Sequence, residues 1–195
     1  MSKPSHDPDA FAELRDAVAA LCSRFTGEYW RKIDEERSYP ELFVKALTDA
    51  GYLAALIPEE YGGSGLGVTE ASIILEAINR SGGNSAVCHG QMYTMGTILR
   101  HGSKEQKAKY LPQVASGELR LQAFAVTEPT TGTDTTRLKT AAVRRGDHYV
   151  VNGQKVWISR VLYSEKREGS GLASKHLSRF TVRLARGFLE IHRLS

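Results

Sequence analysis

The chain has 195 residues, of which 41% are hydrophobic and 25% charged, and its formal net charge is +4. This composition excludes fibrous and wholly disordered proteins and allows one or two domains with hydrophobic cores. With only two cysteines, a disulfide framework is excluded. The sequence contains no run of about 18 apolar residues, so no transmembrane span is predicted. The first residues resemble neither a signal peptide nor a transit peptide, so we expect a reduced, cytoplasmic setting, or the mitochondrial matrix if the source is eukaryotic.

Five helices are predicted in the first part of the chain. Their apolar residues recur at steps of three and four, over about 7–25, 40–50, 69–80, 85–100 and 103–117. Asp7 is placed to cap the first helix and Gly51 to end the second, while Ser103 and Gln106 form a capping box for the last. Residues 1–118 are therefore predicted to form an all-helical domain.

Two features of this domain invite a functional interpretation. The glycine-rich loop after Tyr61 lacks the spacing of a dinucleotide-binding fingerprint, so no nucleotide is assigned to it. Cys88, His89, Gln91 and Met92 lie together on one predicted helix, but no second His or carboxylate stands at metal-ligand spacing. Ordinary packing is the favoured interpretation of this group, and no metal site is predicted.

From Leu119 onward the apolar residues follow strand spacing, with turn signals at Gly132, Gly146 and Gly153. Phe124 and Val126 alternate with smaller residues in a first strand, and Asn152-Gly153 predicts a tight hairpin between two more. The fold class is therefore α+β: an all-helical N-terminal domain, then an incomplete antiparallel β-barrel domain over 119–163.

The loop after the first predicted strand reads Pro-Thr-Thr-Gly-Thr-Asp. Its hydroxyls and backbone N–H groups, with the face of Trp157 and the hydroxyl of Ser159, suit a flat polar ligand. On residue types alone, a plain Thr-rich turn between two strands is the favoured interpretation.

Three spaced blocks resemble the flavin-binding signature of the acyl-CoA dehydrogenase family. They are Val126-Thr127-Glu128-Pro129, Gly132-Thr133-Asp134 and Trp157-Ile158-Ser159. The resemblance runs from about residue 9 to residue 163. It implies a helical N-terminal domain, a middle β-barrel domain and a helical C-terminal bundle, in that order.

The resemblance also implies the chemistry of an oxidoreductase of fatty acid metabolism. A base takes a proton from the α carbon of an acyl-CoA thioester while a hydride leaves the β carbon for flavin N5. The cofactor is FAD, the substrate is an acyl-CoA, and the usual electron acceptor is an electron-transfer flavoprotein. Family members are homo-oligomers, although this assembly is doubtful here.

By resemblance, the FAD-binding residues are Phe124, Val126, Thr127, Gly132, Thr133, Trp157, Ile158 and Ser159, and Thr133 also meets the substrate. Gln91 to Met95 are weaker candidates for substrate contact. In this family the base belongs to the C-terminal domain, so no catalytic residue is assigned. Glu128 and Asp134 are instead interpreted as carboxylates that fix the loop by accepting backbone N–H groups.

Residues 164–195 do not resemble the family. They hold seven of the 26 basic and three of the 22 acidic residues, so the rest of the chain has 19 of each and gives no reason to expect a nucleic-acid partner. We interpret this basic tail as aberrant or disordered, for example the product of a shifted reading frame. An amphipathic basic helix beginning near Phe180 is the alternative.

Together these features predict a truncated acyl-CoA dehydrogenase-like protein with weak FAD binding and little or no activity alone. One alternative is a non-catalytic remnant without flavin. Another is a flavin-dependent monooxygenase of the same fold, which the Thr-Glu-Pro and Gly-Thr-Asp motifs disfavour.

Overall fold

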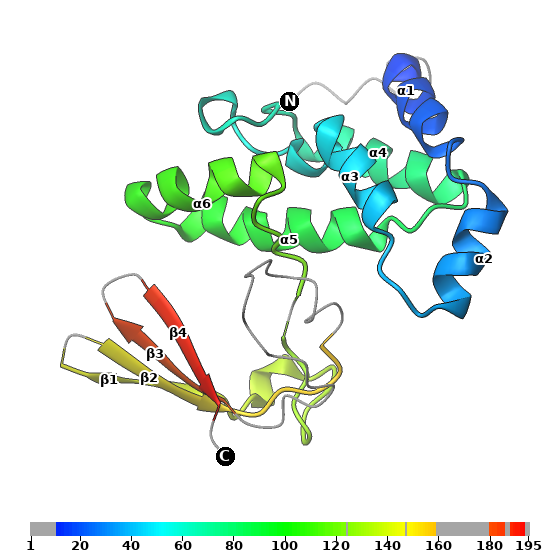
Figure 1. The fold of residues 1–195 in the computed structure, drawn as a ribbon. Helices are drawn as coiled ribbons and strands as arrows, with labels where there is room; N and C mark the ends of the chain where they lie inside the picture. Colours follow the sequence, from blue (N-terminus) through cyan, green and yellow to red (C-terminus); the bar gives the residue numbers. More distant parts are fainter. Residues whose placement is uncertain (1–10, 124, 147, 159–179, 186–187, 194–195) are drawn as a thin grey trace. The chain divides into compact units, whose positions relative to one another are not determined.

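The computed structural model describes residues 11–123, 125–146, 148–158, 180–185 and 188–193 (Figure 1). The chain divides into two compact units, Met1–Gln122 and Ala123–Ser195, which are described separately. The first is helical and the second carries an antiparallel sheet, so the predicted α+β class is confirmed.

Six helices build the helical unit. They are α1 (Ala12–Cys22), α2 (Gly27–Glu35), α3 (Glu41–Asp49), α4 (Val68–Arg80), α5 (Ala86–His101) and α6 (Lys104–Ser116). Two short 3₁₀ turns, η1 (Tyr52–Ala54) and η2 (Glu59–Tyr61), lie between α3 and α4. The five predicted helices correspond to α1, α3, α4, α5 and α6, although the predicted cap of the first, Asp7, lies outside the described residues.

Helix α2 is absent from the sequence-based prediction. It is short and rich in charge, and none of its residues is buried. Its aromatic residues nevertheless join the core, because Trp30 packs edge-to-face on Phe43, with ring centroids 4.8 Å apart. Phe25 contacts the same ring at 5.1 Å. Two aromatic residues in a charged segment give no periodic apolar pattern, so tertiary packing alone reveals this helix.

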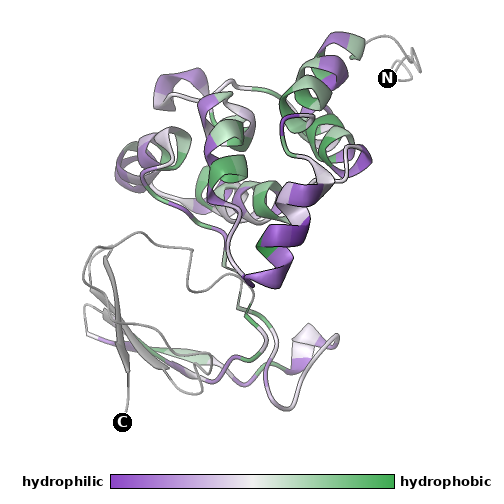
Figure 2. Cartoon of the chain, turned by 45° about the vertical axis from the view of Figure 1, so that its right-hand side comes forward, coloured by the Kyte–Doolittle hydropathy of each residue, from purple (hydrophilic) through white to green (hydrophobic). Residues whose placement is uncertain are grey.

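The core of the helical unit is a single apolar cluster. Figure 2 shows hydrophobic and hydrophilic stretches alternating along the helices of this unit. The residues with no exposed surface come from α1, α3, α4, α5, α6 and the turns between them: Val18, Phe43, Val44, Leu47, Ile57, Ile74, Ile78, Cys88, Met95, Leu111 and Val114. Burial of each large aliphatic side chain contributes about 1.5–3 kcal/mol, so this cluster is the main stabilising element of the unit.

The last residues of the helical unit are tied back to its third helix. Arg120, which is buried, forms an ion pair with Glu41 at 2.7 Å, and its guanidinium lies 5.4 Å from the centre of the Tyr39 ring. The Tyr39 hydroxyl donates a hydrogen bond to the side-chain oxygen of buried Gln122. The chain therefore leaves this unit from a fixed position.

The sheet of the second unit contains four antiparallel strands in sequence order. They are β1 (Ala141–Arg145), β2 (His148–Gly153), β3 (Phe180–Ala185) and β4 (Phe188–Arg193). Gly146 has a φ of +63° and lies in the turn between β1 and β2, as its turn signal predicts. Only a residue that tolerates the left-handed region fits that position easily.

The hairpin predicted at Asn152-Gly153 is wrong. Both residues lie inside β2, where Asn152 pairs with Ala141 and Thr181, and Gly153 pairs with Phe180. Gly153 is needed there for space: a Cβ atom would lie 2.1 Å from the Thr140 hydroxyl oxygen. The glycine is therefore explained by the close approach of Thr140 to β2. A tight turn would require positive φ angles, which neither Asn152 nor Gly153 has.

Two other predictions differ from the structure. Residues 121–123 and 125–127 form no strand; the carbonyls of Val126 and Thr127 instead accept hydrogen bonds from the Lys155 side chain and the Val156 N–H. In the tail, β3 and β4 contradict the basic-helix alternative, since Phe180, Val182 and Leu184 alternate with a period of two, which is typical of strands. That the tail is aberrant stays a prediction, and residues 164–179 lie outside the described residues.

The capping box of α6 provides a direct test of the helical unit. The Ser103 hydroxyl accepts the Gln106 N–H at 3.2 Å, and the Gln106 side chain accepts the Ser103 N–H at 2.8 Å, as predicted. We expect Ser103→Ala to lower the free energy of unfolding by about 1 kcal/mol, measured by urea denaturation followed by circular dichroism. Ser72→Ala, in the middle of α4, is the matched control and should be neutral or slightly stabilising. Equal losses in both variants would contradict this assignment.

Candidate functional site

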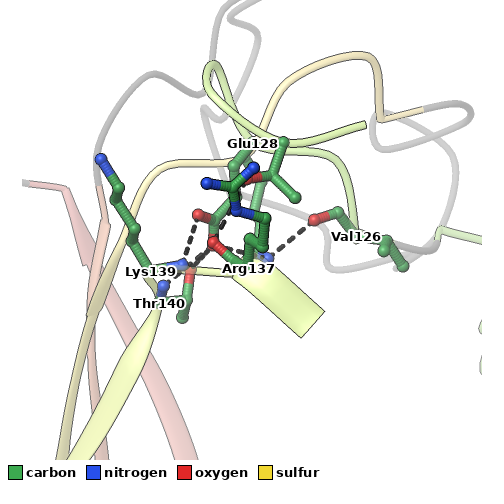
Figure 3. Close-up of polar contacts among 7 residues, drawn as sticks. Val126, Glu128, Arg137, Lys139 and Thr140 are labelled. Carbon is green, nitrogen blue, oxygen red and sulfur yellow. Dashed lines mark hydrogen bonds and ion pairs between the residues drawn. The ribbon is translucent and has the colours of Figure 1, made fainter. Parts of the chain in front are cut away.

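The side chain of Glu128 lies at the centre of the loop before β1 (Figure 3). Only 5% of the residue is exposed. One carboxylate oxygen accepts the Lys139 N–H at 2.7 Å, and the other accepts the Thr140 N–H at 2.9 Å and the Thr140 hydroxyl at 2.5 Å. The carboxylate thus fixes the backbone immediately before β1.

Lys155 completes the surroundings of this carboxylate. Its ammonium, on a side chain that is 7% exposed, donates to Glu128 at 3.0 Å and to the Val126 carbonyl at 2.8 Å. The neighbouring Val156 N–H donates to the Thr127 carbonyl at 2.9 Å. Segments 126–128 and 155–156, which are 29 residues apart at Val126 and Lys155, are therefore held side by side.

The hydrogen bonds determine the charge of Glu128. The Thr140 hydroxyl contributes most, and with the backbone N–H groups of Lys139 and Thr140 and the Lys155 ammonium it lowers the pKa of Glu128 from 4.5 to about 2. The carboxyl is therefore ionised near neutral pH. A buried charge without such partners would be strongly disfavoured, whereas this one has four donors.

The rest of the loop is fixed by local contacts. Glu128 and Thr131 exchange two backbone hydrogen bonds, at 3.0 and 3.1 Å, and the Thr131 hydroxyl donates to the Arg137 carbonyl at 3.2 Å. Asp134 accepts the N–H of Thr136 at 3.3 Å and its hydroxyl at 2.5 Å. Both Glu128 and Asp134 accept backbone N–H groups, as predicted for carboxylates that fix the loop.

The residues predicted to bind a ligand differ in their exposure. Val126 and Thr127 are half-buried, Gly132 and Thr133 are exposed on the loop, and Ile158 is half-buried. Phe124 and Ser159 lie outside the described residues. The structure holds Lys155 and Val156, which precede the third block, against the first block, while the second block lies on the loop after Thr131.

Trp157 is the most exposed large hydrophobic residue described, with 88% of its surface accessible. Its φ is +60°, in the left-handed region that residues with large side chains rarely adopt. The indole therefore offers an open aromatic face directly beside the anchored pair Lys155 and Val156.

The group on α5 serves packing. Gln91 is buried and donates from its amide to the carbonyls of Leu53 and Val114, both at 3.5 Å, while Met92 belongs to the core. Cys88 is buried, which raises the pKa of its thiol, and His89 is exposed. Among the described residues, no group of three or more His, Cys, Asp or Glu could hold a metal ion. No described helix is long and apolar enough to cross a membrane.

Sequence patterns alone do not single out Lys155 or Thr140. The available signal is a lone cation in the segment Gly-Gln-Lys-Val-Trp, where both following residues are apolar. A lysine in that setting either extends its ammonium to solvent or finds a buried partner, and only the structure decides between these possibilities.

Comparison with known proteins identifies the family. The model of the acyl-CoA dehydrogenase N-terminal domain matches residues 8–118, and that of the middle domain matches residues 123–170. The chain belongs to the acyl-CoA dehydrogenase family. The resemblance carried by the three blocks is thereby confirmed, and the middle-domain match extends to residue 170.

Relatives of this acyl-CoA dehydrogenase family member include mitochondrial isovaleryl-CoA dehydrogenase of Bos taurus, 37% identical over 151 residues that cover 75% of this chain and 35% of that protein. A glutaryl-coenzyme A dehydrogenase solved with glutaryl-CoA has a TM-score of 0.73 and 27% identity, and the match covers 95% of this chain and 48% of that one. An acyl-CoA dehydrogenase complexed with FAD from Bacillus anthracis has a TM-score of 0.65 and 30% identity, covering 80% and 27%. The chain thus spans about a third to a half of the length of the curated relatives it matches.

The lowered pKa of Glu128 predicts how the stability of the loop depends on pH. Because the carboxyl has a lower pKa in the folded state, its contribution is complete above 4.5 and is lost as the pH falls towards about 2. Hydrogen exchange of the Lys139 and Thr140 amides should accelerate, relative to its intrinsic rate, over that window. Glu128→Gln should show fast exchange of both amides already at neutral pH and little further pH dependence. Protection that follows the same pH profile in both proteins would contradict this assignment.

The backbone conformation of Trp157 predicts a stabilising substitution. Asparagine tolerates the left-handed region better than tryptophan, and the exposed indole has little packing to lose. We expect Trp157→Asn to raise the free energy of opening at the Val156 amide by about 1 kcal/mol, measured by hydrogen exchange. Tyr149→Asn replaces an exposed aromatic residue within β2 and should instead destabilise the sheet. A loss of protection in Trp157→Asn would show that its φ is not a source of strain.

Proposed function

We propose that this chain provides the N-terminal and FAD-binding parts of an acyl-CoA dehydrogenase, an enzyme that introduces a double bond between the α and β carbons of an acyl-CoA thioester. The observation that carries the proposal is the contact between the first signature block and the two residues that precede the third block. Val156 donates to Thr127, and Lys155 donates to Val126 and Glu128, so the residues just before the third block are held against the first.

The residues present fit a flat, partly polar ring system. Trp157 offers an exposed aromatic face, Thr133 an exposed hydroxyl, and Thr127 a half-buried one. Apart from the two neighbouring residues in the chain, no described heavy atom lies within 4 Å of a Cβ added at Gly132, which leaves room for close approach of a ligand. Phe124, Val126, Ile158 and Ser159 complete the proposed cofactor-binding set, and Thr133 is the proposed substrate contact.

In this proposal each residue positions a reactant. FAD, when bound, supplies the hydride acceptor for the β carbon of the substrate. Trp157 holds the ring by stacking, and the hydroxyls of Thr127 and Thr133 orient its polar edge and the thioester. Glu128 takes no proton from the substrate, because its carboxylate is occupied by the Lys139 and Thr140 N–H groups and by Lys155. No residue of this chain is assigned as the base.

We further propose an acyl-CoA as substrate, an electron-transfer flavoprotein as electron acceptor and a cytoplasmic setting. The 195 residues expressed as they stand should bind FAD weakly and should not oxidise acyl-CoA, because none of the proposed site residues carries a carboxylate or imidazole that could take the proton. Homo-oligomers are expected of the family, and sedimentation of the purified chain measures whether it assembles in the same way.

FAD binding to the purified chain tests the proposal. Titration with FAD should quench flavin fluorescence and perturb the flavin absorbance between about 350 and 500 nm, with an affinity in the micromolar range or weaker. Trp157→Ala should weaken binding by about tenfold, the effect expected for loss of one stacked aromatic contact. Tyr149→Ala, which removes another exposed aromatic residue of the same unit, should leave the affinity unchanged.

Three outcomes would contradict parts of this proposal. No perturbation at millimolar FAD would refute the flavin site, and equal losses in Trp157→Ala and Tyr149→Ala would refute the stacking role of Trp157. A tightly bound yellow chain that bleaches when acyl-CoA is added would show that the 195 residues contain a competent base after all.

A further inference from the structure

The conformation of Trp157 requires an explanation in terms of its neighbours. A left-handed backbone is unfavourable for a residue with a large side chain, so it persists only where the surroundings impose it. With 88% of Trp157 exposed, packing of the indole on the described residues contributes little to that constraint. Among the described residues, the contacts that can impose it are those of the two residues just before Trp157.

The preceding two residues are anchored by three hydrogen bonds. Lys155 donates to the Val126 carbonyl at 2.8 Å and to the Glu128 carboxylate at 3.0 Å, and the Val156 N–H donates to the Thr127 carbonyl at 2.9 Å. All three acceptors belong to the first signature block. The two bonds donated by the Lys155 ammonium are charge-assisted, and such bonds are stronger than hydrogen bonds between neutral groups.

Glu128 is itself fixed from its other side. The N–H groups of Lys139 and Thr140 and the Thr140 hydroxyl hold its carboxylate in place independently of Lys155. The position of Lys155 is therefore set by a rigid acceptor, and the strained residue follows only two positions later. Glu128 and Lys155 are both almost fully buried, so water competes little for this contact.

We propose that Glu128 and Lys155 are positioning residues for the flavin site, which act by holding Trp157 in its left-handed conformation. Their ion pair transmits the geometry of the loop before β1 to the aromatic face beside it. The identity of the ligand rests on the proposed function, whereas the control of Trp157 by the ion pair does not require any ligand.

Fluorine NMR of the full chain labelled with fluorotryptophan tests this proposal directly. The chain contains two tryptophans, Trp30 in α2 and Trp157, so each spectrum has one signal from each unit and Trp157→Phe assigns them. Lys155→Met and Glu128→Gln should both move the Trp157 signal towards that of a flexible, solvent-exposed tryptophan. The Trp30 signal should stay in place and report that the helical unit is folded.

Two further variants separate positioning from general stability. Lys155→Arg keeps the cation and should largely restore the Trp157 signal. Thr140→Val removes one hydroxyl donor to Glu128 but leaves Lys155 and its acceptors intact, so it should weaken the loop without moving the Trp157 signal. If Thr140→Val moves the signal as far as Lys155→Met, or if Lys155→Met and Glu128→Gln leave it unchanged, the proposal is wrong.

FAD affinity is measured on the same proteins as a second readout. Lys155→Met and Glu128→Gln should weaken FAD binding by about tenfold, and Lys155→Arg by no more than about twofold. If the Trp157 signal responds as expected but the unaltered chain binds no FAD, the proposed function fails and the positioning role stands. If FAD binds and its affinity is the same in all variants, the positioning role in the flavin site is refuted. Should Lys155→Met lose all sheet structure, a Glu128→Gln protein with an unmoved Trp157 signal would still overturn the proposal.

Discussion

The buried ion pair between Glu128 and Lys155 is the contact on which the described part of the second unit depends. Removing two charges from water is costly, and the cost is offset here because both groups have further partners: backbone N–H groups and a hydroxyl for the carboxylate, and a carbonyl for the ammonium. Such a pair adds little to stability compared with apolar packing, but it allows only one arrangement of the segments it joins. The ion pair is therefore explained better by the fixed arrangement it gives to segments 126–128 and 155–156 than by any gain in stability.

The helical unit obeys simpler rules, and the sequence predicts it well. Helical periodicity identifies the helices that carry a continuous apolar face, and local capping signals such as Ser103 with Gln106 mark their ends, because these signals act over three or four residues. Helix α2 escapes prediction for the same reason: its few apolar residues meet Phe43 only after the chain has folded. Short-range rules therefore succeed wherever the stabilising contacts are themselves short-range.

The same distinction between short-range and long-range contacts decides which parts of the candidate site the sequence predicts. Resemblance identifies the three blocks and the loop-fixing character of Glu128 and Asp134, since those depend on residue identity. The partner of Glu128 is not accessible in this way, because Lys155 lies 27 residues further on and no spacing rule connects them. Asn152-Gly153 misleads for a related reason: the dipeptide is typical of turns, but a contact with Thr140, more than ten residues away, explains the glycine better than local geometry does.

That contact gives Gly153 an influence beyond its own strand. The Thr140 hydroxyl that a side chain at position 153 would strike is the same hydroxyl that donates to Glu128. A larger residue at position 153 must therefore displace the Thr140 hydroxyl from the Glu128 carboxylate. The loop would lose this hydrogen bond although no residue of the three blocks had changed. Motif matching would score such a variant as intact, although its loop would have lost one of the donors that define its shape.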